Sequence, residues 1–221
     1  TTIYEQTPAF ARIGAGIQMS PNAMRVLYGI GVGEFIRRTA FEPPHWRNRD
    51  YDTGNLTNDH PLGPDAFDRY GVPYILMHRG DLHAALHGAV PDETICYAHT
   101  LVGIDQNDSG VTLSFENGEA VKYDAVIASD GVHSPVRDWM LGAEDAHFTG
   151  RLAYRTAFPA SQMNGYKLMD DSAKWWGPDR HIVIYYVTRN RDEIYFTTSQ
   201  PEPDFQVESW SATGDVKELR D

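Results

Sequence analysis

The order of a β-prone run and a pair of glycines near the start of the chain constrains the fold most. A dinucleotide-binding unit needs Gly-x-Gly-x-x-Gly directly after its first strand, with an acidic residue about 20 positions later for the ribose. Here the run TTIYE precedes the glycines, and Met19 stands where the third glycine of GAGIQM belongs. We therefore interpret Thr1 to Glu5 as the second strand of such a unit. The first strand and the phosphate loop are expected upstream of Thr1.

Helical patterns follow the glycine pair. Ser20 and Pro21 form a typical N-cap and first helical position, and the apolar residues after them repeat at helical spacing. The glycines within residues 29–33 predict a helix break before a short second helix. Residues 41–74 are polar and aromatic with weak periodicity, which predicts an irregular excursion with a short strand or two. Residues 72–88 change from a β-like run into another helix.

The rest of the chain favours strands. Alternating runs separated by NDSG and ENGE predict a β-meander that ends in a fully apolar strand over residues 125–128, followed by a short helix. Past residue 146, long β-prone runs rich in aromatic residues predict an antiparallel sheet. The fold class is therefore α/β. We expect a first domain over 1–146 and a second domain over 147–221, and we expect the excursion 41–74 to extend from the first toward the second. The closing GDVKELRD opens a helix that we expect to continue beyond Asp221.

Composition restricts the partners. The 19 basic and 31 acidic residues give a formal charge of −12, which predicts no attraction to nucleic acid or to an anionic membrane. No run of about 18 apolar residues occurs, and Cys96 is the single cysteine, so it forms no internal disulfide. These features favour a small-molecule partner and a cytoplasmic location, and no metal-ligand motif is apparent.

Several motifs in this order resemble a known family. They are the strand ending in Glu5, Arg12 before GAGI, HRGDLHAAL, SDGVHSPVR, and the block KWW…RHIVIYY. The chain resembles the flavin-dependent aromatic hydroxylases of the para-hydroxybenzoate hydroxylase group, and within it the 6-hydroxynicotinate 3-monooxygenases and salicylate hydroxylases. The resemblance implies a partial Rossmann-like FAD-binding domain joined to a substrate domain. It also implies hydroxylation of a hydroxylated aromatic or pyridine carboxylate with NADH or NADPH and O2, and is compatible with a homodimer.

The resemblance assigns cofactor contacts to five positions. Glu5 would accept hydrogen bonds from the adenosine ribose of FAD. Arg12 and Arg79 would contact the pyrophosphate and ribityl oxygens, for which a guanidinium fork is suited. Asp130 and Gly131 match an Asp-Gly motif near the flavin, although Asp-Gly is also common in ordinary strand-to-helix turns.

The substrate contacts are expected in the second domain and beside the glycine pair. Alternation along HIVIYYV places His181, Val183 and Tyr185 on one face. In the 6-hydroxynicotinate enzymes the matching His and Tyr line the substrate pocket, so His181 and Tyr185 are the catalytic candidates. Where those enzymes carry a pocket His after GAGI, this chain has Gln18, which cannot act as a base at neutral pH. The GAG segment is therefore interpreted as a scaffold that presents Gln18 to the substrate ring.

Two other hypotheses remain beside this one. The chain lacks the upstream glycine loop and a downstream Gly-Asp motif that would embrace the ribityl chain. It could therefore be a non-catalytic fragment or a degenerate homologue that does not hold FAD. A reductase or an antibiotic-modifying monooxygenase of the same fold is the third reading.

Overall fold

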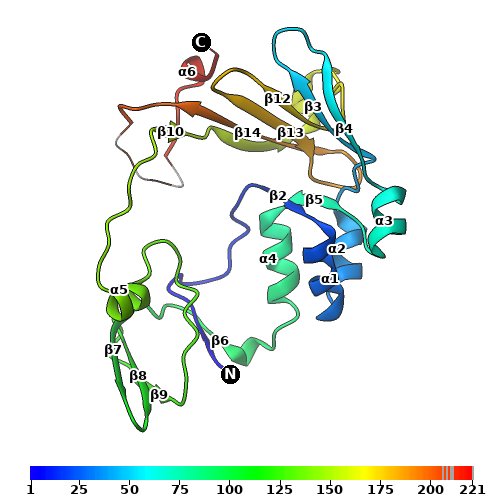
Figure 1. The fold of residues 1–221 in the computed structure, drawn as a ribbon. Helices are drawn as coiled ribbons and strands as arrows, with labels where there is room; N and C mark the ends of the chain where they lie inside the picture. The colour runs from blue at the N-terminus through cyan, green and yellow to red at the C-terminus, as the bar shows by residue number, and fades with distance from the viewer. Residues whose placement is uncertain (206, 208, 210–211, 221) are drawn as a thin grey trace. The chain divides into compact units, whose positions relative to one another are not determined.

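The computed structural model describes residues 1–205, 207, 209 and 212–220 (Figure 1). The chain divides into two compact units. The first combines residues 1–11 with 90–147, and the second combines residues 12–89 with 148–221. The second domain predicted for 147–221 thus shares its compact unit with residues 12–89. The predicted boundary between two domains at residue 146 stays a prediction.

In the first unit, a short parallel pair precedes a meander. Strand β1 (Ile3–Tyr4) pairs in parallel with β6 (Ile95–Cys96), as a strand of a dinucleotide-binding unit should. The antiparallel meander consists of β7 (Leu101–Asn107), β8 (Gly110–Phe115) and β9 (Ala120–Tyr123), and the helix α5 (Pro135–Leu141) follows it. The predicted meander and the predicted short helix are therefore confirmed.

One predicted strand of this unit is wrong. Residues 125–128 form no strand, and the side chain of Ile127 is 92% exposed. A fully apolar strand is stable only when neighbouring strands satisfy its backbone and cover both of its faces. Within the described residues of this unit, β1 and β6 pair only with each other, so residues 125–128 have no such neighbour.

The second unit contains a helical layer. It begins with β2 (Gly16–Met19), α1 (Pro21–Gly29) and α2 (Gly33–Thr39), and continues later with β5 (Ile75–His78) and α4 (Arg79–His87). Pro21 occupies the first turn of α1 as predicted, while the Ser20 side chain makes no capping bond to the helix backbone. The helix break at the glycines and the short second helix are confirmed.

A mixed sheet forms the other layer of this unit. Its strands lie in the order β10, β14, β13, β12, β3, β4, and β11 also pairs with β14. Their bounds are β3 (His45–Asp50), β4 (Leu56–Pro61), β10 (Arg151–Leu152), β11 (Arg155–Pro159), β12 (Ser172–Trp176), β13 (His181–Tyr186) and β14 (Glu193–Pro201). The strands β11 to β14 confirm the predicted antiparallel sheet. The short strand or two predicted within 41–74 are confirmed as β3 and β4. Their pairing into this sheet and the helix α3 (Pro64–Tyr70) that follows them make the excursion more regular than predicted.

Strand β5 joins the two cores of this unit. All four of its residues are buried. Ile75 and Met77 belong to a core cluster with Met24 and Ile36 of the helices, while Leu76 belongs to the cluster of Tyr185 and the sheet. The period of two along a strand explains this division between opposite faces. The last helix, α6 (Val216–Arg220), confirms the helix predicted for the end of the chain.

Candidate substrate pocket

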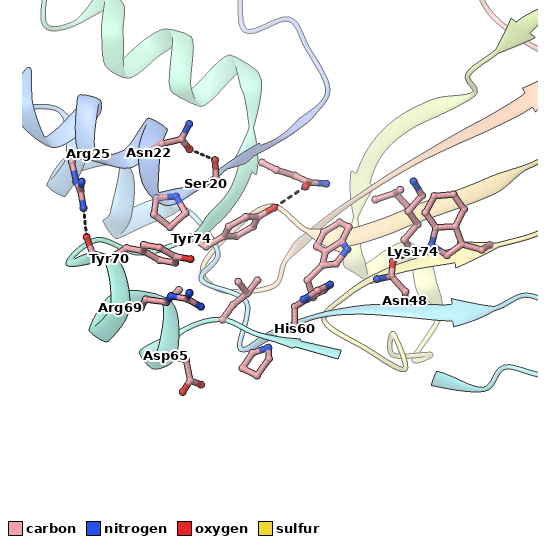
Figure 2. A pocket seen from close by; sticks show the side chains of 18 residues that line it. Ser20, Asn22, Arg25, Asn48, His60, Asp65, Arg69, Tyr70, Tyr74 and Lys174 are labelled. Atoms are coloured by element: carbon pink, nitrogen blue, oxygen red, sulfur yellow. Dashed lines mark hydrogen bonds between the residues drawn. The ribbon is translucent and has the colours of Figure 1, made fainter. Parts of the chain in front are cut away.

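A cavity of about 1040 Å³ lies within the second unit. Figure 2 shows that its lining side chains come from the sheet on one side and from α1 and α3 on the other. Lys174 and Asn48 lie at the sheet end, while Arg25, Asp65 and Tyr70 lie at the helical end. The cavity is large enough for a small aromatic ligand, for which pockets of about 300 to 1000 Å³ are usual.

Strand alternation explains the sheet wall of the cavity. Lys174 on β12 lies opposite Val183 on β13 and opposite Asn48 on β3, so these three side chains emerge on one face. Trp176 follows Lys174 by two residues and therefore shares this face. Its indole Nε1 donates a hydrogen bond to Oδ1 of Asn48 at 3.1 Å, which fixes the ring.

Gln18 lines the cavity from β2, which pairs antiparallel with β5. The hydroxyl of Tyr74 donates a hydrogen bond to Oε1 of Gln18 at 2.8 Å. Burial raises the pKa of Tyr74 to about 12, so this hydroxyl keeps its proton near neutral pH. Since the Gln18 amide nitrogen has two N–H donors and Tyr185 engages one of them, the other is left to donate to a ligand.

Gly16 is required for packing. A Cβ at this position would lie 2.4 Å from Cδ1 of Tyr195 and 2.7 Å from the hydroxyl oxygen of Tyr185. Real carbon atoms do not approach so closely, so only glycine lets β2 pass against these two rings. The second glycine of GAG therefore has a structural reason that involves no phosphate.

Tyr185 lies beneath the cavity wall. It is 2% exposed and is not among the residues that line the cavity, and its ring centroid lies 6.2 Å from that of Trp46, which does line it. Burial is the main cause that raises the pKa of the Tyr185 hydroxyl above its ordinary value. Tyr195 and Tyr74 add to this effect, and a hydrogen bond with Gln18 opposes it. Tyr185 can therefore act on a ligand through Gln18.

His181 lies beside the cavity at the edge of the sheet wall. Its ring centroid is 5.3 Å from that of the lining residue Trp176, and His181 itself does not line the cavity. Burial, then the positive charges of Lys174 and Arg151, lower the pKa of His181 below its ordinary value. Its imidazole is therefore neutral near pH 7 and can accept a proton.

The predicted cofactor contacts fall in both units. Glu5 directly follows β1, and its Oε1 accepts a hydrogen bond from the backbone N–H of Thr7 at 2.8 Å. Arg12 forms ion pairs with Asp81 at 2.5 Å and with Glu193 at 3.3 Å. Arg79 is exposed in the first turn of α4. Glu5 thus has the chemistry to accept hydrogen bonds from ribose hydroxyls, and Arg79 has the charge to bind a phosphate. Arg12 would have to share its guanidinium between FAD and the carboxylates of Asp81 and Glu193.

Asp130 and Gly131 lead into helix α5. The Asp130 carboxylate accepts hydrogen bonds from the Ser134 hydroxyl at 2.6 Å and from the Val136 backbone N–H at 3.2 Å. Burial by itself would raise the pKa of Asp130, but these hydrogen bonds outweigh it and lower the pKa overall. Gly131 has a φ of +86°, in the left-handed region that favours glycine. The local role of this Asp-Gly pair is to start α5, and a role near a flavin stays a prediction.

Sequence reasoning missed several residues of the cavity. The missed residues that the proposals below depend on are Tyr74, Trp46, Asn48, Lys174 and Trp176. The sequence could have indicated Lys174, because Lys174 and Trp176 are two positions apart on a predicted strand and must share a face. No sequence pattern indicates Trp46 and Asn48, since they lie in the excursion 41–74, where periodicity is weak.

Neither a metal site nor a membrane span is found in the described ranges. No group of three or more His, Cys, Asp or Glu side chains there is placed to hold a metal ion. No helix in that part of the chain is long and apolar enough to cross a membrane.

Comparison with known proteins identifies the homologues of the chain. No family model matches it. The sequence is 39% identical over 209 residues to a 6-hydroxynicotinate 3-monooxygenase of Bordetella bronchiseptica, which covers 94% of this chain and 55% of that protein. A protein of the same name from Pseudomonas fluorescens is 38% identical over 209 residues, covering 94% and 53%. The crystal structure of CtdE in complex with FAD and substrate 4 has a TM-score of 0.82 at 20% identity, covering 99% of this chain and 55% of that chain.

These comparisons confirm the resemblance predicted from the motifs. The homologues of this chain are monooxygenases of aromatic and pyridine rings, and its architecture is a partial FAD-binding fold. The relatives named above are 6-hydroxynicotinate 3-monooxygenases. The chain spans about half the length of the curated relatives it matches.

Proposed function

We propose that this chain belongs to an FAD-dependent monooxygenase that hydroxylates a hydroxylated aromatic or pyridine carboxylate, using NADH or NADPH and O2. The observation that carries the proposal is the 39% identity to a 6-hydroxynicotinate 3-monooxygenase over 94% of the chain, which includes the whole cavity. Similarity of this extent does not favour a degenerate homologue. Glu5, Arg12, Arg79, Asp130 and Gly131 are the residues proposed to contact FAD, which supplies the oxygen chemistry when it is bound and reduced.

The cavity would bind and orient the aromatic ring. Trp46 and Trp176 offer flat apolar surfaces, and Gln18, held by Tyr74, offers a fixed amide donor. Val183 adds an apolar surface to the sheet wall. These side chains also displace water from the ring, which protects reactive species from side reactions.

His181 and Tyr185 are the residues that we propose handle the proton of the ring hydroxyl. Removal of this proton makes the ring richer in electrons and therefore a better nucleophile. His181 lies beside the cavity residue Trp176, and its neutral imidazole can accept the proton there. Tyr185 would act through Gln18, since it is buried behind the wall and bonded to that amide.

The proposed partner is a small aromatic molecule, and the charge of −12 disfavours nucleic acid. We also propose a homodimer, which a molar-mass measurement in solution tests. A chain that remains monomeric at micromolar concentration would contradict the homodimer alone.

Substrate-stimulated oxidation of NADH and NADPH is the test of the activity. The chain, expressed with any flanking sequence that its gene encodes, is expected to carry a flavin absorption spectrum. Hydroxylated benzoates and pyridine carboxylates should stimulate its oxidation of the reductant and yield a hydroxylated product. A flavin-bearing protein that none of these compounds stimulates would contradict the proposed function.

Two variants test the site residues. Gln18→His is expected to shift the ratio of kcat/KM toward 6-hydroxynicotinate, since it restores an imidazole beside Tyr74. Tyr185→Phe should lower stimulated turnover by about 1 to 3 kcal/mol in activation free energy, the range for one polar contact, and weaken FAD binding less. Tyr166→Phe is the matched control, because Tyr166 is 80% exposed and lies outside the cavity. An unchanged substrate ranking together with equal behaviour of the two Tyr variants would place the pocket elsewhere.

A further inference from the structure

The sheet end of the cavity carries a lysine that the proposed function leaves unused. Lys174 lines the cavity, and its Nζ lies 3.6 Å from the centroid of the Trp176 ring. Trp176 is itself fixed by its hydrogen bond to Asn48. A cation over the face of an indole is held by the ring quadrupole while its N–H groups stay available on the open side.

No acidic side chain neutralises this lysine within the described part of the chain. The other ammonium or guanidinium groups of the cavity, on Arg25 and Arg69, lie at the helical end with Asp65, far from Lys174 in Figure 2. Arg25 there donates to the backbone carbonyl of Tyr70 at 2.7 Å. The sheet end is therefore a partly desolvated positive site, and burial lowers the pKa of Lys174 accordingly. An anion placed there would restore the favourable environment of the ammonium group.

The side chains at this end of the cavity favour a flat anion. Lys174 and Trp176 emerge from β12 on the same face as Val183 of β13, so charge, aromatic surface and aliphatic surface adjoin. Gln18 lines the same cavity from another element and offers amide donors. The cavity therefore offers an amide donor to a polar substituent of the ring and an ammonium group to a carboxylate.

We propose that Lys174 binds the carboxylate of the substrate and thereby selects aromatic carboxylates over neutral rings. This inference rests on the proposed function for the class of ligand, an aromatic ring. Its content is a specificity-determining residue on β12. A free ammonium group forms charge-assisted hydrogen bonds with a carboxylate, and a neutral carboxamide of the same shape cannot use that charge.

Matched ligands and variants separate charge from shape. Binding of 6-hydroxynicotinate and 6-hydroxynicotinamide is measured by quenching of the protein's tryptophan fluorescence, to which Trp46 and Trp176 in the cavity contribute. This measurement needs no turnover. Hydroxybenzoates and their amides extend the panel. Lys174→Met keeps most of the length and removes the charge, Lys174→Arg keeps the charge, and Lys167→Met removes an exposed charge outside the cavity.

The expected result is a loss of selectivity. Lys174→Met should weaken binding of the acids about 10- to 100-fold and of the amides less than about 3-fold, as for one charge-assisted hydrogen bond. Lys174→Arg should keep the preference for acids, and Lys167→Met should match wild type. Equal weakening of acids and amides in Lys174→Met, or no weakening, would overturn the role of Lys174.

The same experiment distinguishes the two proposals. Acid binding that depends on Lys174 without stimulated oxidation would support this inference and contradict the proposed function. If acids stimulate oxidation and Lys174→Met still prefers acids to amides, the proposed function would be supported and this inference contradicted. A wild-type protein that binds none of the panel would overturn both.

Discussion

Substitution of Gly16 by alanine tests why the GAG segment needs its second glycine. The new Cβ would lie 2.4 Å from Cδ1 and 2.5 Å from Cγ of Tyr195, and 2.7 Å from the hydroxyl oxygen of Tyr185. Carbon atoms pack at about 3.5 to 4.0 Å, so β2 or the rings must move by about 1 Å. The Cγ atom can move away only if the Cα–Cβ bond of Tyr195 rotates, and that rotation would carry the whole ring out of its buried position.

The cost follows from how firmly these rings are held. Tyr185 and Tyr195 are both buried, with centroids 5.3 Å apart, and belong to the core cluster of the sheet. Inserting a methyl group into a well-packed core typically costs 1 to 3 kcal/mol. Because two rings and the β2 backbone meet here, we expect Gly16→Ala to lower the free energy of unfolding by about 2 to 3 kcal/mol.

Urea unfolding followed by tryptophan fluorescence measures this loss. With a typical m of about 1 to 3 kcal/mol per molar urea, the midpoint should fall by about 1 M. Gly29→Ala is the matched control, since Gly29 ends α1 and an added Cβ would meet no atom within 4 Å. In a Tyr195→Ala background the penalty of Gly16→Ala should shrink by at least about 1 kcal/mol, a coupling expected for residues in contact.

The outcome that refutes this reasoning is specific. If Gly16→Ala unfolds like Gly29→Ala while binding of an anionic ligand weakens, the glycine serves a phosphate. If the penalty is the same with and without the Tyr195 ring, another contact causes it. Either result would remove the packing explanation for GAG.

Two further predictions concern charged pairs. Asp170→Asn should lower the free energy of unfolding by about 2 to 4 kcal/mol, because the 3% exposed carboxylate pairs with Arg47 at 2.7 Å and Arg49 at 2.5 Å. Burial would raise the pKa of Asp170, but the two arginines lower it overall. The difference in unfolding free energy between wild type and variant, measured by urea titration, should therefore stay constant from about pH 5 to 7 and shrink below about pH 4. The hydrogen bond to Glu119 at 2.9 Å raises the pKa of His99, so its stabilisation is full below about pH 6.5 and is lost as the pH rises through the raised value. The stability difference between wild type and His99→Gln should therefore be larger at about pH 6 than at about pH 9, and an equal difference would show that the pair contributes nothing.

Local sequence patterns determined much of the secondary structure. Pro21 and the apolar repeat after it define α1, and the NDSG and ENGE turns define the meander, because helix starts and tight turns depend on neighbouring residues. Alternation likewise assigned His181, Val183 and Tyr185 to one face of β13. The run over residues 125–128 failed, since its apolar character indicates burial and says nothing of which strand lies beside it.

Only the tertiary structure decided which side chains form the cavity. The sequence singled out Gln18, His181 and Tyr185, but the excursion that it treated as irregular supplies β3, which pairs in parallel with β12. That pairing places Asn48 beside Lys174 and aligns the Trp176 indole with its acceptor. The register between strands so distant in sequence depends on packing and hydrogen bonds across the whole sheet, which no local period encodes. For the same reason, the charge of Lys174 became a candidate anion site only when the fold left it without an acidic neighbour among the described residues.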